Sequence, residues 1–201
     1  MKKKLVKMIE LLKGILTLLG TASFMIVVGC VCIRLKLFKS LAPKNNMTSK
    51  LAIALVFGLL AIYGTLMGTE TSGAIVNVRE LASMIAGVAG GPISGLLAGL
   101  IGGIHRYSVG GFTALPCSVS TVLLGVISGF ASKWITGKAY LLKGAVLGFI
   151  LESFAMALIL VLTEPLTQAV TIVEQIAIPM ITADTIGLVL WLSLSKMRKS
   201  A

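Results

Sequence analysis

The chain has 201 residues, of which 57% are hydrophobic and 12% are charged, and its mean hydropathy is +1.02. Soluble domains carry about 25% charged residues, so this composition predicts an integral membrane protein, and the length leaves no room for a soluble catalytic domain beside the spans. The net charge of +11 does not indicate nucleic-acid binding, because the basic residues stand in short flanks between apolar segments. There they orient the protein and contact the lipid bilayer.

Six apolar segments are long enough to cross a bilayer, which takes about 20 helical residues. In chain order they are residues 14–33, 51–67, 81–104, 114–135, 141–162 and 172–194. An open sheet edge cannot lie in lipid, so all six are predicted to be helices. We therefore predict an all-α integral membrane protein, a compact bundle of about six transmembrane helices in which residues 1–201 form one domain. The basic start of the first segment is typical of a signal peptide, but the long apolar stretch without a small-residue cleavage site indicates a retained span.

The basic residues allow two topologies. The positive-inside rule places the lysines of residues 133–143 and the basic residues of 196–199 in the cytoplasm. Six crossings then put the lysines of residues 2–4 inside as well, but leave the basic residues of 34–50 outside. A re-entrant third segment, broken at residues 90–92, would place 34–50 inside and the N-terminal lysines outside. We prefer six crossings and retain five crossings plus a re-entrant segment as the alternative.

The third segment carries a ladder of glycines, one in every four residues. The ladder consists of Gly87, Gly91, Gly95, Gly99 and Gly103. Glycines at this spacing share a helix face and let a neighbouring helix approach the backbone closely. We predict that the ladder packs against another helix, either within the chain or in a homodimer.

Two arginines flank the ladder. Arg79 follows Asn77 at the start of the third segment, and Arg106 follows His105 at its end. In the simplest interpretation both reach the lipid headgroups from opposite ends of a helix. A straight helix of about 27 residues is about 40 Å long, so the two arginines would not meet. They meet if residues 90–92 break the segment, or if the glycine-rich stretch after it folds back.

The two arginines predict a site with excess positive charge. Glu80 is the only carboxylate near them in sequence. A guanidinium group binds a planar carboxylate or phosphate with two parallel hydrogen bonds, so a small organic anion would fit. The fourth segment adds Cys117 and Ser120, which are three residues apart and share a helix face just after Pro116. Amides and hydroxyls at a helix start also favour anions.

Other polar residues point to no further chemistry. Glu152 and Asp184 lie mid-span, where they could be protonated, pair with an arginine or take part in ion coupling, and we favour structural pairing. Cys30 and Cys32 are interpreted as small buried side chains, because three cysteines in this spacing make neither a disulfide framework nor a metal site. His105 is the only histidine, and no phosphate-binding loop or nucleotide-binding glycine motif occurs. We expect no catalytic residue, no metal and no cofactor.

Several motifs occur together between residues 75 and 130. They are Asn-Val-Arg-Glu at 77–80, Gly-Val-Ala-Gly-Gly-Pro at 87–92, Gly-Leu-Leu-Ala-Gly at 95–99, Arg106, Gly-Gly at 110–111 and Gly-Val-Ile-Ser-Gly at 125–129. This set closely resembles the LytS/YehU-type (5TM Lyt) receptor, the multi-span input domain of bacterial sensor histidine kinases and of some diguanylate cyclases. Softer agreement extends to residues 148–152 and 179–187.

The resemblance implies a receptor in the bacterial cytoplasmic membrane that detects the state of the cell envelope or an extracellular metabolite, pyruvate being the best-supported ligand. In the pyruvate-sensing branch two arginines, a cysteine and a serine bind the ligand, and by motif these fall on Arg79, Arg106, Cys117 and Ser120. Residues expected to support them are Asn77, Glu80, His105, Glu152 and Asp184. The resemblance also implies a histidine kinase output module or partner chain, and commonly a dimer.

Two features depart from the family pattern. Asp184 stands where relatives look to carry asparagine, and no dimerisation or ATP-binding domain follows residue 201. We therefore expect an excised input domain or a stand-alone receptor without kinase activity of its own. The rival class is the substrate-binding subunit of an energy-coupling-factor vitamin transporter, a fold-level analogy resting on six short helices in about 200 residues. Nothing favours a third class, a holin-like structural protein.

Overall fold

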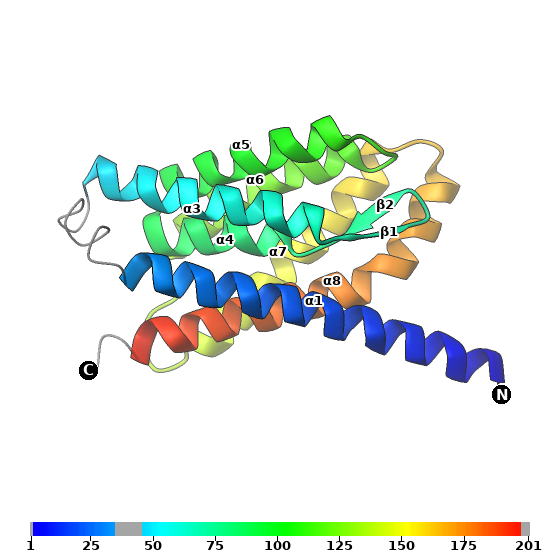
Figure 1. Cartoon of the computed structure of the whole chain (residues 1–201), viewed down its shortest axis with the longest axis horizontal. Coiled ribbons are helices and arrows are strands. Elements are labelled where there is room, and N and C mark those ends of the chain that lie inside the picture. The colour runs from blue at the N-terminus through cyan, green and yellow to red at the C-terminus, as the bar shows by residue number, and fades with distance from the viewer. Residues whose placement is uncertain (1, 35–45, 198–201) are drawn as a thin grey trace.

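The computed structural model describes residues 2–34 and 46–197, and within these ranges the chain forms seven helices and one β-hairpin (Figure 1). The helices are α1 (Lys2–Arg34), α3 (Met47–Leu66), α4 (Arg79–Gly90), α5 (Pro92–Val109), α6 (Ala114–Ala131), α7 (Tyr140–Leu162) and α8 (Leu166–Met197). The antiparallel strands β1 (Thr69–Thr71) and β2 (Ala74–Val76) connect α3 to α4. The predicted all-α membrane bundle is confirmed.

Five helices are long and apolar enough to cross a bilayer, namely α1, α3, α6, α7 and α8. By contrast, α4 has 12 residues, which makes it about 18 Å long, and the hydrocarbon core is about 30 Å thick. The predicted third span is therefore not one crossing helix. Of the two topologies that the sequence allowed, the structure has five long helices plus a re-entrant pair, α4 and α5.

The re-entrant pair exists because the third segment breaks at Gly91. This residue has φ +85° and ψ −177°, a backbone conformation that glycine adopts without steric cost. Its amide donates to the Gly87 carbonyl oxygen at 2.8 Å, and Pro92 begins α5 with a fixed φ suited to a first helical turn. The chain reverses here, so α4 and α5 run side by side in opposite directions (Figure 1). The start of α4 and the last turn of α5 consequently lie toward the same end of the bundle.

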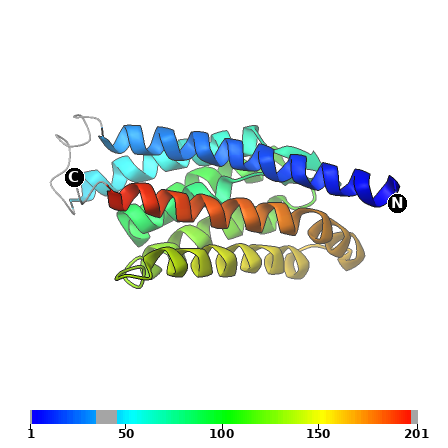
Figure 2. The same cartoon turned by 90° about the horizontal axis from the view of Figure 1, so that it is seen from below.

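The two ends of the bundle differ in charge. The first turns of α1 and the last turns of α8 lie at opposite ends (Figures 1 and 2). The end that holds the last turns of α8 also holds Lys50, Lys133 and Lys138, whereas Glu70 and Glu164 lie in connections at the other end, where α1 begins with the lysines of residues 2–7. The positive-inside rule, applied to the connections between helices, makes this lysine-rich end cytoplasmic and leaves the N-terminal lysines outside, as expected for five crossings. The basic residues at 36–44 and 198–199 lie outside the described residues.

Helix α4 runs through the middle of the bundle. Its first nine residues, 79–87, are all buried, and it contacts α3, α5, α6 and α8. A helix that is buried on every face must be surrounded by other elements. Any polar group on α4 therefore has to be satisfied by the neighbouring helices and not by water.

The glycine ladder lies at the contact between the re-entrant pair and α6. A Cβ atom on Gly95 would overlap the carbonyl oxygen of Gly125, and on Gly99 or Gly103 it would come within 2.9 Å of the α6 backbone. Gly87 on α4 faces the same part of α6. These glycines bring the backbones close together within one chain, as small residues do in membrane helix packing.

We expect Gly95→Ala to destabilise the protein by about 1–3 kcal/mol, because the backbone oxygen that the new methyl group meets cannot rotate away. The matched control is Gly20→Ala on α1, where a Cβ meets nothing within 4 Å. That change should leave stability unchanged or raise it by up to about 1 kcal/mol through helix propensity. The measurement is thermal unfolding of both variants in the same detergent. Equal melting temperatures would contradict the described α5–α6 packing.

The two topologies also differ in where the β-hairpin lies. In a background without native cysteines, Ser72→Cys should react with a membrane-impermeant maleimide in intact cells, because five crossings place the hairpin outside. Six crossings would place it inside. Thr136→Cys, in the loop between α6 and α7, serves as the internal control. It should react with the maleimide only after the membrane is permeabilised. If Ser72→Cys does not react with the maleimide in intact cells, the six-crossing topology is supported instead.

Candidate functional site

A buried ion pair stands at the first turn of α4. Arg79 is 0% exposed and its Nη2 forms an ion pair with Oε1 of Glu80, the next residue. Its Nε donates to Thr121 Oγ1 at 2.6 Å, and its Nη2 also donates to the Cys117 carbonyl oxygen at 3.3 Å. The pair is thus bound to the first turns of α6. Its Nη1 has no hydrogen-bond partner among the described residues.

The backbone around Arg79 fixes its position. Asn77 Oδ1 accepts from the Arg79 amide at 2.9 Å, and Asn77 Nδ2 donates to the Ile75 carbonyl oxygen at 2.6 Å. Asn77 therefore joins the end of the hairpin to the start of α4. Gly64 lets α3 approach the start of α4 closely, because a Cβ on Gly64 would lie 3.2 Å from the Arg79 amide nitrogen.

Hydroxyl groups of α6 complete the surroundings of Glu80. Ser120 Oγ lies 3.1 Å from Glu80 Oε1 and 3.0 Å from the Cys117 carbonyl oxygen. Thr121 Oγ1 lies 3.3 Å and 2.7 Å from the same two atoms. Cys117, Ser120 and Thr121 share one face of α6, as their spacing of three and four residues predicts. Glu80 Oε2 has no partner among the described residues.

Arg106 is a second buried guanidinium group, and it has a different environment. It is 0% exposed in the last turn of α5, where Nη1 donates to the Gly110 carbonyl oxygen and Nη2 donates to Thr113 Oγ1 at 3.1 Å. It also lies against the Cys117 thiol. Within residues 2–34 and 46–197, no carboxylate forms an ion pair with it, and its Nε has no hydrogen-bond partner. A buried charge without a counter-ion is costly.

The structure brings together Arg79, Arg106, Cys117 and Ser120, because the break at Gly91 returns the end of α5 to the start of α4. It does not join His105 to them: the ring is half-buried, its Nδ1 has no partner, and no hydrogen bond between the ring and these residues occurs in the described part.

Thr113 has a role that was not predicted from the sequence. Its hydroxyl accepts from Arg106 at 3.1 Å, directly before α6 begins. The signal that could have identified it is its position as the polar residue immediately before an apolar helix, within a glycine-rich stretch that reaches back to Arg106.

Three carboxyl groups converge from three helices behind the ion pair. Glu80 of α4, Glu152 of α7 and Asp184 of α8 are each at most 1% exposed, and one oxygen atom from each lies within 4.8 Å of the other two. Structural pairing of Glu152 and Asp184 was expected, and the two side chains lie against each other, but neither pairs with an arginine among the described residues, whose one ion pair is Arg79–Glu80. The reason is that the adjacent Glu80 already occupies Arg79, so α7 and α8 meet the carboxylate side of the pair.

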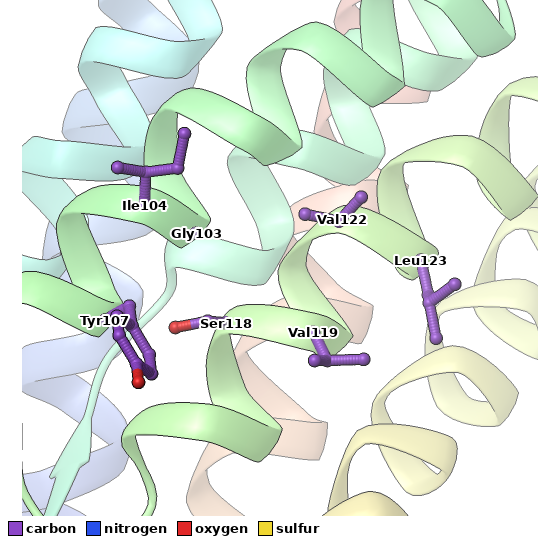
Figure 3. A pocket seen from close by; sticks show the side chains of 7 residues that line it. All are labelled: Gly103, Ile104, Tyr107, Ser118, Val119, Val122 and Leu123. Atoms are coloured by element: carbon purple, nitrogen blue, oxygen red, sulfur yellow. The ribbon is translucent and has the colours of Figure 1, made fainter.

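A groove of about 370 Å³ lies elsewhere, between α5 and α6 (Figure 3). Its lining residues are Gly103, Ile104, Tyr107, Ser118, Val119, Val122 and Leu123. The lining is apolar, and the Ser118 hydroxyl is engaged by the Ala114 carbonyl oxygen at 2.7 Å. Ile104 and Tyr107 are exposed, as expected of side chains that face lipid in a membrane span. The groove contains none of the charged residues and is not the candidate site.

Comparison with known proteins agrees with the five long helices. The family model described as 5TMR of 5TMR-LYT matches residues 35–198, and the chain belongs to this family. It is thus homologous to the membrane input domains of sensor histidine kinases and is a multi-pass protein of the bacterial cytoplasmic membrane. Family membership favours a sensor over the transporter subunit that the sequence left as an alternative.

Three relatives illustrate the similarity. Sensor histidine kinase YpdA of Escherichia coli K12 is 34% identical over 176 residues, 86% of this chain and 31% of YpdA. Sensor histidine kinase BtsS of the same organism is 36% identical over 145 residues, 69% of this chain and 26% of BtsS. Sensor protein LytS of Bacillus anthracis is 31% identical over 208 residues, 92% of this chain and 34% of LytS. The chain therefore spans between about a quarter and a third of the length of these curated relatives. No solved structure matches it.

The buried ion pair predicts that Arg79 is needed for stability. Arg79→Ala leaves Glu80 buried without its partner beside two further carboxyl groups, which should cost about 3–5 kcal/mol. Lys138→Ala, in an exposed loop, is the matched control and should cost less than about 1 kcal/mol. Thermal unfolding in detergent measures both. A melting temperature of Arg79→Ala equal to that of the control would show that the ion pair does not hold α4 in place.

Proposed function

We propose that this chain is the signal-input domain of a LytS-type sensor, which binds a small extracellular carboxylate and passes the signal to a histidine kinase output module. The observation that supports this most directly is Arg106, a fully buried guanidinium group for which the described residues supply no carboxylate. A ligand carboxylate would supply the missing negative charge. Family membership supports the sensor role, because the relatives are named as sensor kinases and sensor proteins.

The hydrogen bonds of Arg106 suggest how a carboxylate would bind. Its two terminal nitrogens point at the Gly110 carbonyl oxygen and the Thr113 hydroxyl, both in the connection between α5 and α6. A carboxylate accepts two parallel hydrogen bonds from a guanidinium group and would form stronger bonds than these neutral acceptors do. Ligand binding would then release residues 110–113 from Arg106.

The neighbours of Arg106 favour a short ligand with a second oxygen. Arg79 has a free Nη1, and the Cys117 thiol and Ser120 hydroxyl lie on the same face of α6. Pyruvate has a planar carboxylate and an adjacent keto oxygen, so the carboxylate could bind Arg106 while the keto oxygen accepts from one of these donors. The connection between α5 and α6 lies at the end of the bundle opposite the lysine-rich end, which fits a ligand that arrives from outside.

The contact between α4 and α8 is the proposed path by which the binding signal reaches the kinase output module. Leu81 follows the ion pair on α4, and a Cβ on Gly187 of α8 would overlap its side chain. Asp184, one turn earlier on α8, faces Glu80. A shift of α4 on ligand binding would therefore press directly on α8, which ends at the cytoplasmic side where a kinase module would follow. Pro179 lacks the amide of an ordinary helical residue, so α8 is easier to bend just before this contact.

The test is calorimetric binding of pyruvate and a panel of small carboxylates to the purified protein. We expect saturable binding by the wild type and a loss of at least 100-fold in affinity for Arg106→Ala, corresponding to about 2.8 kcal/mol. Arg106→Lys keeps the positive charge but cannot form two parallel hydrogen bonds with a carboxylate. We expect its loss of affinity to be intermediate. Lys138→Ala is the control and should bind as the wild type does.

Stability has to be separated from recognition in this experiment. Arg106→Ala is compared with the wild type only at temperatures where thermal unfolding shows both to be folded. Unchanged affinity in folded Arg106→Ala would place the ligand elsewhere. An absence of binding across the panel would reject the carboxylate ligand and favour detection of the envelope state by the same family of domain.

A further inference from the structure

The convergence of Glu80, Glu152 and Asp184 is not used by the proposed carboxylate site. The three side chains come from α4, α7 and α8, which are far apart in sequence, and one oxygen of each lies within 4.8 Å of the others. Both oxygens of Glu152, both oxygens of Asp184 and Oε2 of Glu80 are buried without a hydrogen-bond partner among the described residues. Each of the three carboxyl groups thus brings at least one oxygen atom to a shared point inside the bundle.

The charges in this region do not balance when all groups are ionised. Arg79 and Glu80 neutralise each other, which leaves two negative charges on Glu152 and Asp184. Other polar groups near the cluster are the Leu81 backbone amide, which lies by Asp184, and the Ser120 and Thr121 hydroxyls on α6, which are bonded to Oε1 of Glu80 or to the α6 backbone. Uncompensated buried carboxylates are strongly unfavourable, so positive charge has to enter the cluster from outside the protein.

We propose that Glu80, Glu152 and Asp184 form a binding site for one hard divalent metal cation, which displaces the protons that otherwise neutralise Glu152 and Asp184. An all-oxygen carboxylate set is the donor chemistry that Mg²⁺, Ca²⁺ and Mn²⁺ prefer. Three oxygens with mutual separations of at most 4.8 Å can all contact a cation at metal–oxygen distances of about 2.1–2.6 Å after small side-chain adjustments. One divalent ion also supplies the two missing positive charges.

No metal site was expected from the sequence, because histidine and cysteine spacing gave no sign of one. This site has neither residue type, and its members are joined only by the packing of α4, α7 and α8 in the assembled bundle. It is independent of the carboxylate ligand, which is left out of the test below. Among the described residues, Arg79 on α4 acts on Glu152 and Asp184, and Cys117 on α6 acts on Glu80; neither is a candidate ligand for a hard cation.

The experiment titrates CaCl₂, MgCl₂ and MnCl₂ separately into the chelator-treated full chain in lipid nanodiscs, by calorimetry at pH 6.5 and pH 8.0. We expect saturable binding of one ion per chain for at least one of the three cations, tighter at pH 8.0 because protons compete for the same oxygens. The heat should vary with the ionisation enthalpy of the buffer, which reports the released protons. Asp184→Asn and Glu152→Gln should each weaken binding at least 30-fold.

Glu174→Gln is the matched control, because Glu174 lies on α8 but is exposed, and it should bind the cation as the wild type does. If Asp184→Asn or Glu152→Gln fails to fold, the wild-type titration still decides through its stoichiometry and its proton release. No saturable binding of any of the three cations would overturn the proposal. Binding that is independent of pH, or equal in wild type and folded Asp184→Asn, would also overturn it by placing the ion on the surface.

Discussion

The buried Arg79–Glu80 ion pair is the constraint on which the surrounding structure depends. Removing two charges from water is expensive unless nearly every hydrogen-bonding atom finds a partner. Here the partners come from α6. The Cys117 carbonyl oxygen and the Thr121 hydroxyl accept hydrogen bonds from Arg79, and the Ser120 hydroxyl lies against the Glu80 carboxylate. The first turn of α4 is therefore held against the first turns of α6, and the position of α4 in the centre of the bundle follows from this attachment.

The glycines solve the steric part of the same problem. A short helix can pass through the middle of a bundle only if its neighbours approach its backbone closely. Gly64 lets α3 approach the backbone at Arg79, and Gly87 and Gly95 bring α4 and α5 onto the backbone of α6. Polar recognition and close packing are thus combined on one pair of helices, which is why charged residues flank the glycines in a single stretch of the sequence.

The class of fold and the identity of the arginine cluster could be predicted from the sequence, because long apolar segments are typical of membrane spans and isolated charges within them are typical of polar sites. The motif resemblance was needed to connect Arg79 with Arg106, since a continuous helix would have kept them about 40 Å apart. What decides between the two arrangements is the backbone conformation of Gly91, and a glycine-proline pair is compatible with either a kinked helix or a complete reversal.

The carboxyl cluster could not be predicted in the same way. Glu152 and Asp184 lie on different helices, and no spacing rule relates residues that are not on the same element. Their meeting with Glu80 depends on which helices neighbour α4, which is a property of the assembled bundle. The same holds for Thr113, whose contact with Arg106 depends on the path of the connection between α5 and α6.

The length of α4 has a consequence for how the protein is made. A helix of 12 residues that begins with Arg79 and Glu80 is too short and too polar to partition into lipid by itself as it leaves the ribosome. The long helices can insert one after another, but α4 becomes stable only when α6 and α8, both synthesised later, are there to surround it. Helix α4 is consequently among the last elements to be buried. The final step in the biogenesis of this domain is the packing of α6 and α8 around the Arg79–Glu80 ion pair.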